Sequence, residues 1–114
     1  MQSRGFELYL ELAEERRRLV ERLREVLREL KEEVERLVPG ARVYLFGSYA
    51  RGEATAASDV DVLVVIEESD YARADEVRAL LRRRFLGYPL EVHVVTREQY
   101  ERWYARFVDT LVEV

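Results

Sequence analysis

An apolar stripe runs along the first third of the chain. Leucine and valine recur there at spacings of three and four, which is the repeat of one face of an α-helix: Leu12, Leu19, Leu23, Val26, Leu27, Leu30, Val34, Leu37 and Val38. Glu14 and Arg18, an acid-first pair four residues apart, favour the same conformation. Pro39 and Gly40 end the pattern, which predicts one long helix over residues 6–38.

Three later segments have the length and composition of β-strands. They span residues 42–46, 60–66 and 90–95. The middle segment is so apolar that both of its faces must be mostly buried, as in the centre of a sheet. Between the first two strands, residues 48–53 predict a short helix or turn.

Two more helices are predicted. Residues 70–86 are amphipathic, with one apolar side formed by Val77, Leu80, Leu81 and Phe85. Thr96 followed by Gln99 resembles a capping box and predicts a last helix over residues 97–112. The order of the elements predicts a single α/β (α+β) domain over residues 1–114, with helices packed on a small sheet.

The composition narrows the class of protein. Hydrophobic residues make up 48% of the chain and charged residues 37%, which indicates a folded rather than a disordered protein. No apolar stretch reaches the ~18–20 residues that cross a membrane, and no secretory signal precedes the first helix, so a cytoplasmic location is expected. The absence of cysteine excludes disulfides, zinc thiolates and thiol catalysis.

The charges give no sign of a nucleic-acid-binding protein. The formal net charge is −4, whereas direct binding to nucleic acid usually requires a basic patch or stripe. The arginine run at residues 16–18 is better explained by a solvated helix face than by an anion site. The run at residues 82–84 lies in a last helical turn, where cations offset the helix dipole.

Two aspartates open the middle strand. Asp59 and Asp61 are two residues apart, so their side chains leave the same face, with backbones about 6.6–7 Å apart. Converging carboxylates repel unless a cation lies between them, and Mg²⁺ takes one or two carboxylates together with phosphate oxygens. The alternative, two acids that only solubilise a loop edge, is disfavoured because Leu63 and Val65 continue this face as buried residues.

A third acid stands on the neighbouring strand. Glu91 fits either as a third metal ligand or as the base that deprotonates an attacking hydroxyl group, against the simpler alternative of a charged residue near a strand end. His93 shares its face and could touch the substrate, although a hydrogen-bonded structural role is favoured for it.

A glycine-serine pair ends the first strand. Gly47 has no side chain, so backbone N–H groups can approach a phosphate, and Ser48 adds a hydroxyl donor. Arg51 lies one turn further on and could pair with a triphosphate oxygen. Ser58 directly precedes the aspartates and could orient one of them by a hydrogen bond.

Gly47-Ser48, a spacer of ten residues and Asp59-Val60-Asp61 resemble the nucleotidyltransferase superfamily that includes DNA polymerase beta, and most closely its minimal nucleotidyltransferases. The resemblance covers about residues 41–95 and implies a mixed sheet flanked by helices. It also implies transfer of a nucleoside monophosphate from a triphosphate such as ATP, with Mg²⁺, as two ions, held by the aspartates and a third acid. That acid is often Asp in the family, and Glu91 here places its carboxylate about one methylene further out.

The resemblance also implies a partner. Many small members resemble antitoxins that transfer AMP onto a tyrosine of a helical HEPN-domain toxin, and this chain leaves no residues for a separate acceptor-binding domain. The acceptor site must then come from a partner or a second copy. Two alternatives are transfer to a small molecule such as an aminoglycoside and a non-catalytic binding module. The module would use the apolar surface of the long N-terminal helix and of an aromatic C-terminal segment formed by Tyr100, Trp103, Tyr104 and Phe107.

Overall fold

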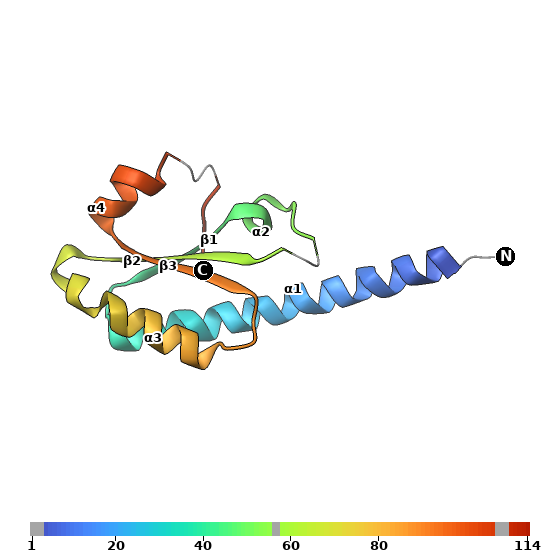
Figure 1. The fold of residues 1–114 in the computed structure, drawn as a ribbon, viewed down its shortest axis with the longest axis horizontal. Helices are drawn as coiled ribbons and strands as arrows, with labels where there is room; N and C mark the ends of the chain where they lie inside the picture. The colour runs from blue at the N-terminus through green and yellow to red at the C-terminus, as the bar shows by residue number, and fades with distance from the viewer. Residues whose placement is uncertain (1–3, 56–57, 107–109) are drawn as a thin grey trace.

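A four-stranded mixed sheet forms the centre of the fold (Figure 1). The computed structural model describes residues 4–55, 58–106 and 110–114. The strand order is β3-β2-β1-β4, with β2 parallel to β3 and antiparallel to β1, and with β4 antiparallel to β1 at the far edge. The strands are β1 (Arg42–Phe46), β2 (Val60–Ile66), β3 (Leu90–Thr96) and β4 (Val112–Glu113).

Helices lie on both faces of this sheet, which confirms the predicted fold class. Figure 1 shows α1 (Arg4–Leu37) and α3 (Ala74–Arg84) on one face, and α2 (Gly47–Arg51) and α4 (Arg97–Gln99) on the other. The helix predicted over residues 70–86 is split, because a 3₁₀ turn, η1 (Glu68–Arg73), precedes α3.

The hydrophobic core lies between the sheet and the pair α1 and α3. Alternate residues of β2 point into it, and Val60, Val62 and Val64 are all fully buried. The helices contribute from the opposite side with Leu30, Val34, Val77 and Leu81, and Val38, directly after α1, adds to them. The intervening residues of β2, beginning with Asp61, therefore point to the other face of the sheet.

Only part of α1 packs on the sheet. Among the side chains that the structure describes, Leu23 is the first buried residue of this helix, and the preceding turns project beyond the domain (Figure 1). The molecule is consequently 63 Å long and only 29 Å across. Within the described ranges, no helix is apolar and long enough to cross a membrane.

The C-terminal prediction was wrong in its extent. The capping box at Thr96 is present, since Thr96 Oγ1 accepts a hydrogen bond from the backbone N–H of Gln99 and the Gln99 side chain accepts one from Thr96. After α4, however, a single wide helical turn, η2 (Tyr100–Tyr104), ends the helical segment that was predicted to reach residue 112. Phe107 lies outside the described residues.

A fourth strand takes the place of the end of that helix. β4 pairs with Tyr44 and Leu45 of β1, and the backbone N–H of Val114 donates to Val43. Lys31 of α1 donates to the Val114 carbonyl at 2.7 Å. These partners are distant in sequence. At residues 112–114, pairing with the free edge of the sheet therefore outweighs the local preference for a helix.

Leu30 provides a test of this core. Leu30→Ala should lower the free energy of unfolding by about 3 kcal/mol, because it leaves a cavity at a fully buried position between α1 and the sheet. The matched change Leu86→Ala, at a side chain that is 82% exposed, should cost less than about 0.5 kcal/mol. Urea denaturation measures both values, and equal losses would contradict the packing described here.

Candidate functional site

The polar residues of the sheet gather on the face opposite α1 and α3. Strand register places Phe46 of β1, Asp61 of β2 and Glu91 of β3 in one row across the sheet. The next row along this face holds Leu63 and His93 on neighbouring strands. Because β2 and β3 are parallel and in register, the acids of two separate strands lie side by side.

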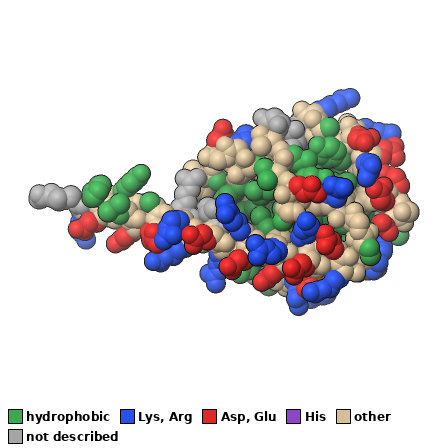
Figure 2. Space-filling model, turned by 180° about the vertical axis from the view of Figure 1, so that it is seen from behind, with side chains coloured by type: hydrophobic (Ala, Val, Ile, Leu, Met, Phe, Trp, Pro, Cys, Tyr) green, Lys and Arg blue, Asp and Glu red, His purple; other side chains and the backbone are tan. Residues whose placement is uncertain are grey.

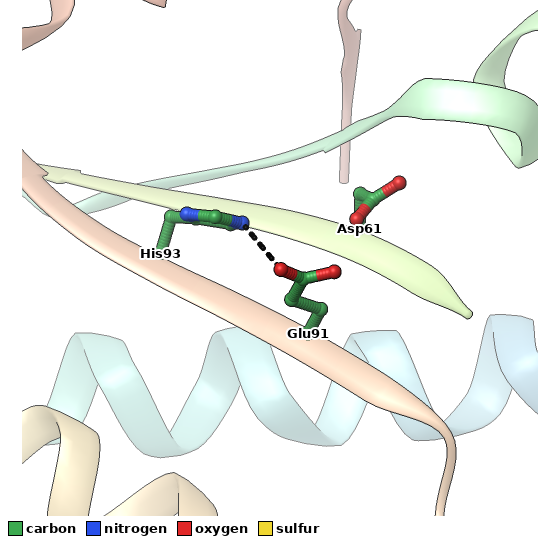
Figure 3. Close-up of side chains that lie close together, drawn as sticks. All are labelled: Asp61, Glu91 and His93. Carbon is green, nitrogen blue, oxygen red and sulfur yellow. Dashed lines mark ion pairs between the residues drawn. The ribbon is translucent and has the colours of Figure 1, made fainter.

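Asp61, Glu91 and His93 form a compact group (Figure 3). One ligand atom from each residue lies within 4.8 Å of the other two. The His93 Nε2 atom is 3.6 Å from Glu91 Oε1. Figure 3 shows the three side chains converging above β2 and β3, on the side of the sheet away from α1.

The orientation of His93 is set by aromatic neighbours. Its Nδ1 atom is 3.2 Å from the Tyr104 hydroxyl group of η2. Its ring packs edge-on against Phe46, at 5.5 Å between centroids, and against Tyr104, at 5.7 Å. With Nδ1 engaged, Nε2 is directed toward the carboxylates. The expected hydrogen-bonded role of His93 is therefore present. His93 also joins the candidate metal ligands, and its position two residues after Glu91 on the same strand face is the sequence signal for this second role.

The electrostatics of the group centre on Asp61. Partial burial raises the pKa of Asp61, the nearby Glu91 carboxylate raises it further, and His93 opposes these effects. The charge of Asp59 adds to the increase. A carboxyl group whose ionisation is hindered by burial and by a neighbouring carboxylate is a suitable environment for a divalent cation, which would favour the charged form of Asp61.

Gly47 lies directly against the Asp61 carboxylate. A methyl group built on its α-carbon would overlap Asp61 Oδ2, and its φ of 74° belongs to the left-handed region that favours glycine. Gly47 is the first residue of α2 and follows Phe46, the register partner of Asp61. The Gly-Ser turn and the second aspartate are therefore in contact, although fourteen positions separate them in the chain.

Asp59 lies apart from this group. It is solvent-exposed and immediately precedes β2. Among the described residues, the carboxylates and imidazole within ligand distance of one another are those of Asp61, Glu91 and His93. The role of Asp59 as a metal ligand stays a prediction, at the open edge of the same site.

The other predicted nucleotide-binding residues surround the turn. Ser48 is partly buried in α2, and Arg51, at the end of that helix, donates from Nε to Glu53 at 3.1 Å. The Ser58 hydroxyl group accepts a hydrogen bond from the backbone N–H of Thr55 at 2.9 Å, so it organises the loop before β2. No described contact joins Ser58 to either aspartate.

The donor set fits a divalent cation. Two carboxylates and one imidazole nitrogen converge, and Glu91 retains 58% of its side-chain exposure, so the site is open to solvent on one side. Mg²⁺ keeps open positions for water and phosphate oxygens when a protein holds it through few carboxylates. The arrangement can therefore bring a metal-bound phosphate next to the backbone of the Gly-Ser turn.

Gly47 and Gly52 form a matched pair for testing this contact. Both have a φ of 74°, but a Cβ at Gly52 would meet nothing within 4 Å. Gly52→Ala should lower the free energy of unfolding by about 1 kcal/mol through backbone strain alone. Gly47→Ala should cost at least about 1 kcal/mol more, because the Asp61 carboxylate must also move. Urea denaturation compares them, and equal costs would show that the contact is not tight.

Solved structures share this architecture. One, described as a "putative nucleotidyltransferase", superposes with a TM-score of 0.66 at 27% identity and covers 77% of this chain and 96% of its own. A second, from Sulfolobus solfataricus and described in the same terms, gives a TM-score of 0.57 at 28% identity, over 78% of this chain and 76% of its own.

Sequence comparison leads to the same family. A Methanocaldococcus jannaschii protein named "Putative protein adenylyltransferase" is 33% identical over 86 residues, which are 74% of this chain and 84% of that protein. Another of the same name and organism is 34% identical over 67 residues, 58% of this chain and 78% of its own. Residues 27–111 match the sequence profile described as a nucleotidyltransferase domain. The chain therefore belongs to the nucleotidyltransferase domain family, as its Gly-Ser and Asp-x-Asp spacing predicted.

Proposed function

We propose that this chain catalyses the Mg²⁺-dependent transfer of AMP from ATP to a hydroxyl group of a partner protein. The observation that carries the proposal is the contact between Gly47 and the Asp61 carboxylate, because it joins a phosphate-binding turn to a metal-binding acid. The names of the relatives, protein adenylyltransferases, favour a protein as the acceptor.

The reaction is a displacement at the α-phosphorus of ATP. The acceptor oxygen forms a bond to the α-phosphorus, the bond from that phosphorus to the bridging oxygen breaks, and pyrophosphate leaves. The acceptor proton passes to a carboxylate, and Glu91, the most open member of the group, suits this role. Backbone N–H groups of the Gly47-Ser48 turn and the Arg51 guanidinium hold the phosphates.

Asp59, Asp61 and Glu91 would hold two Mg²⁺ ions, which when bound neutralise phosphate charge and orient the reacting oxygens. His93, whose Nε2 atom lies 3.6 Å from Glu91 Oε1, would help to orient the Glu91 carboxylate. Asp61, Glu91 and His93 point to the side of the sheet away from α1 (Figure 3), which is the face that carries α2 and α4 (Figure 1), and an acceptor protein would have to approach from this side.

The partner that best fits the resemblance is a HEPN-domain toxin whose tyrosine receives AMP, with this chain as its antitoxin. The excess of acidic residues, with a net charge of −4, agrees with a protein rather than a nucleic acid as the acceptor.

Radiolabel transfer tests the proposal. With α-labelled ATP, Mg²⁺ and a HEPN-domain protein as the acceptor, the wild type should label that protein. Asp59→Asn and Asp61→Asn should each lower labelling at least about 100-fold, since each removes a metal-binding charge. The control Asp70→Asn, on η1, should retain wild-type labelling.

Undiminished labelling by the two site variants would refute the metal assignment. Binding of the partner without any transfer by the wild type would instead favour a non-catalytic module. Transfer to an added aminoglycoside but not to the protein would favour a small-molecule acceptor.

The charged Asp61 carboxylate should lower the stability of the metal-free folded protein. Because folding raises the pKa of Asp61, the metal-free folded state loses stability as pH rises from the unfolded value through the folded one. Asp61→Asn should therefore raise the melting temperature of the metal-free protein at pH 7, with a smaller gain at pH 4.

Magnesium should stabilise the wild type but not the Asp61→Asn variant, because the variant lacks the carboxylate that would bind the cation. Saturating Mg²⁺ should raise the melting temperature of the wild type by about 2–5 °C and leave Asp61→Asn unchanged. Thermal melts in EDTA and in MgCl₂ at both pH values measure these shifts. An equal response of the two proteins to Mg²⁺ would place the cation elsewhere.

A further inference from the structure

The projecting half of α1 exposes large apolar side chains. Figure 2 shows them gathered near the free end of the helix, with charged side chains along the rest of the projection. Their exposed fractions range from 50% to 67%: Phe6 63%, Leu8 55%, Tyr9 67%, Leu10 51% and Leu12 50%. A solvated helix of this kind has no core of its own, and helices that stand alone in water are marginally stable.

Three of these residues continue the face that is buried further along. Eighteen residues correspond to about five turns of an α-helix, so positions separated by this interval point the same way. The exposed and buried members of the pairs are Leu8 and Val26, Tyr9 and Leu27, and Leu12 and Leu30. The face that packs on the sheet at residues 23–38 thus extends uncovered over the free end.

The charges of the projection are divided along its length. Residues 7–15 carry the acids Glu7, Glu11, Glu14 and Glu15 and no basic residue. Arginine dominates the following stretch, which includes Arg17, Arg18, Arg22 and Arg24. The segment is therefore complementary in charge to a reversed copy of itself, whereas a parallel copy would place acids beside acids.

One edge of the helix makes this complementarity specific. Glu11, Glu15, Arg18 and Arg22 follow at spacings of four, three and four, and so lie along one edge beside the apolar face. An antiparallel partner whose symmetry axis crosses between residues 16 and 17 brings Glu11 next to Arg22 and Glu15 next to Arg18. Within the part of the chain that the structure describes, Glu11, Glu15 and Arg22 form no ion pair of their own, and Arg18 pairs with Glu14 at 3.4 Å.

We propose that a second copy of this chain docks antiparallel on residues 6–22 of α1, so that residues 11–22 face the same residues of the copy and residues 6–10 face its residues 23–27. The apolar face supplies the driving force, and the divided charges select the antiparallel orientation. The contact is isologous, as a two-fold dimer requires. Each free helix end then lies beside the residues at which the other copy's helix joins its own domain.

Charge reversal tests this arrangement by sedimentation equilibrium. The wild type should be a dimer, with twice the chain mass of 13.5 kDa. Glu11→Arg/Glu15→Arg and Arg18→Glu/Arg22→Glu should each raise the dimer dissociation constant at least about tenfold, because each makes the edge uniformly charged. An equimolar mixture of the two variants should restore dimers.

The matched control is Glu32→Arg/Glu35→Arg. It changes the net charge by the same amount as Glu11→Arg/Glu15→Arg, but at two exposed positions of α1 beside the sheet, and should leave the dimer intact. Far-UV circular dichroism of each variant reports whether the helix persists. A monomeric wild type at 100 µM, including one that binds only a partner of different sequence, overturns the proposal. So does a Glu11→Arg/Glu15→Arg variant that dimerises as tightly as the wild type, which is the behaviour of a parallel pair.

Discussion

The close approach of Gly47 to the Asp61 carboxylate is the constraint on which the site depends. It requires an antiparallel register that pairs Phe46 with Asp61, and a left-handed glycine immediately after the strand. Any side chain at Gly47 would occupy the space of the carboxylate. The turn that can bind phosphate and the acid that can bind metal therefore share one boundary, and their relative position is set by backbone geometry rather than by flexible side chains.

The strands that hold the site also hold the core, on opposite faces. Val60, Val62 and Val64 pack against α1 and α3. Asp61, which lies between Val60 and Val62 in the chain, points to the opposite, open face of the sheet. This alternation lets buried apolar contacts fix the position of a carboxylate whose own environment is unfavourable. The raised pKa of Asp61 reflects that cost, because partial burial disfavours the charged carboxylate and repulsion from Glu91 adds to the effect.

Elements that depend on interactions between neighbouring residues were predicted correctly, whereas an element that depends on residues distant in the chain was not. The strands at residues 42–46 and 60–66 were predicted from their apolar runs, and the start of α4 from the capping box at Thr96. The end of that helix was predicted wrongly, because β4 depends on Tyr44, Leu45 and Lys31, which lie far away in the chain. Local patterns report local hydrogen bonds, and a sheet edge is completed by distant ones.

The sequence by itself determined the long first helix, the first three strands and the shared face of Glu91 and His93 on β3, and it predicted phosphate-and-metal chemistry for the Gly-Ser and Asp-x-Asp residues. Side-chain periodicity and residue type are properties of neighbouring positions, so they can be read without a fold. Only the tertiary structure decided that Gly47 touches Asp61, that His93 joins Asp61 and Glu91, and that Asp59 stays outside this group. Those relations follow from strand register and long-range packing, in which a shift of one residue would turn every side chain to the other face.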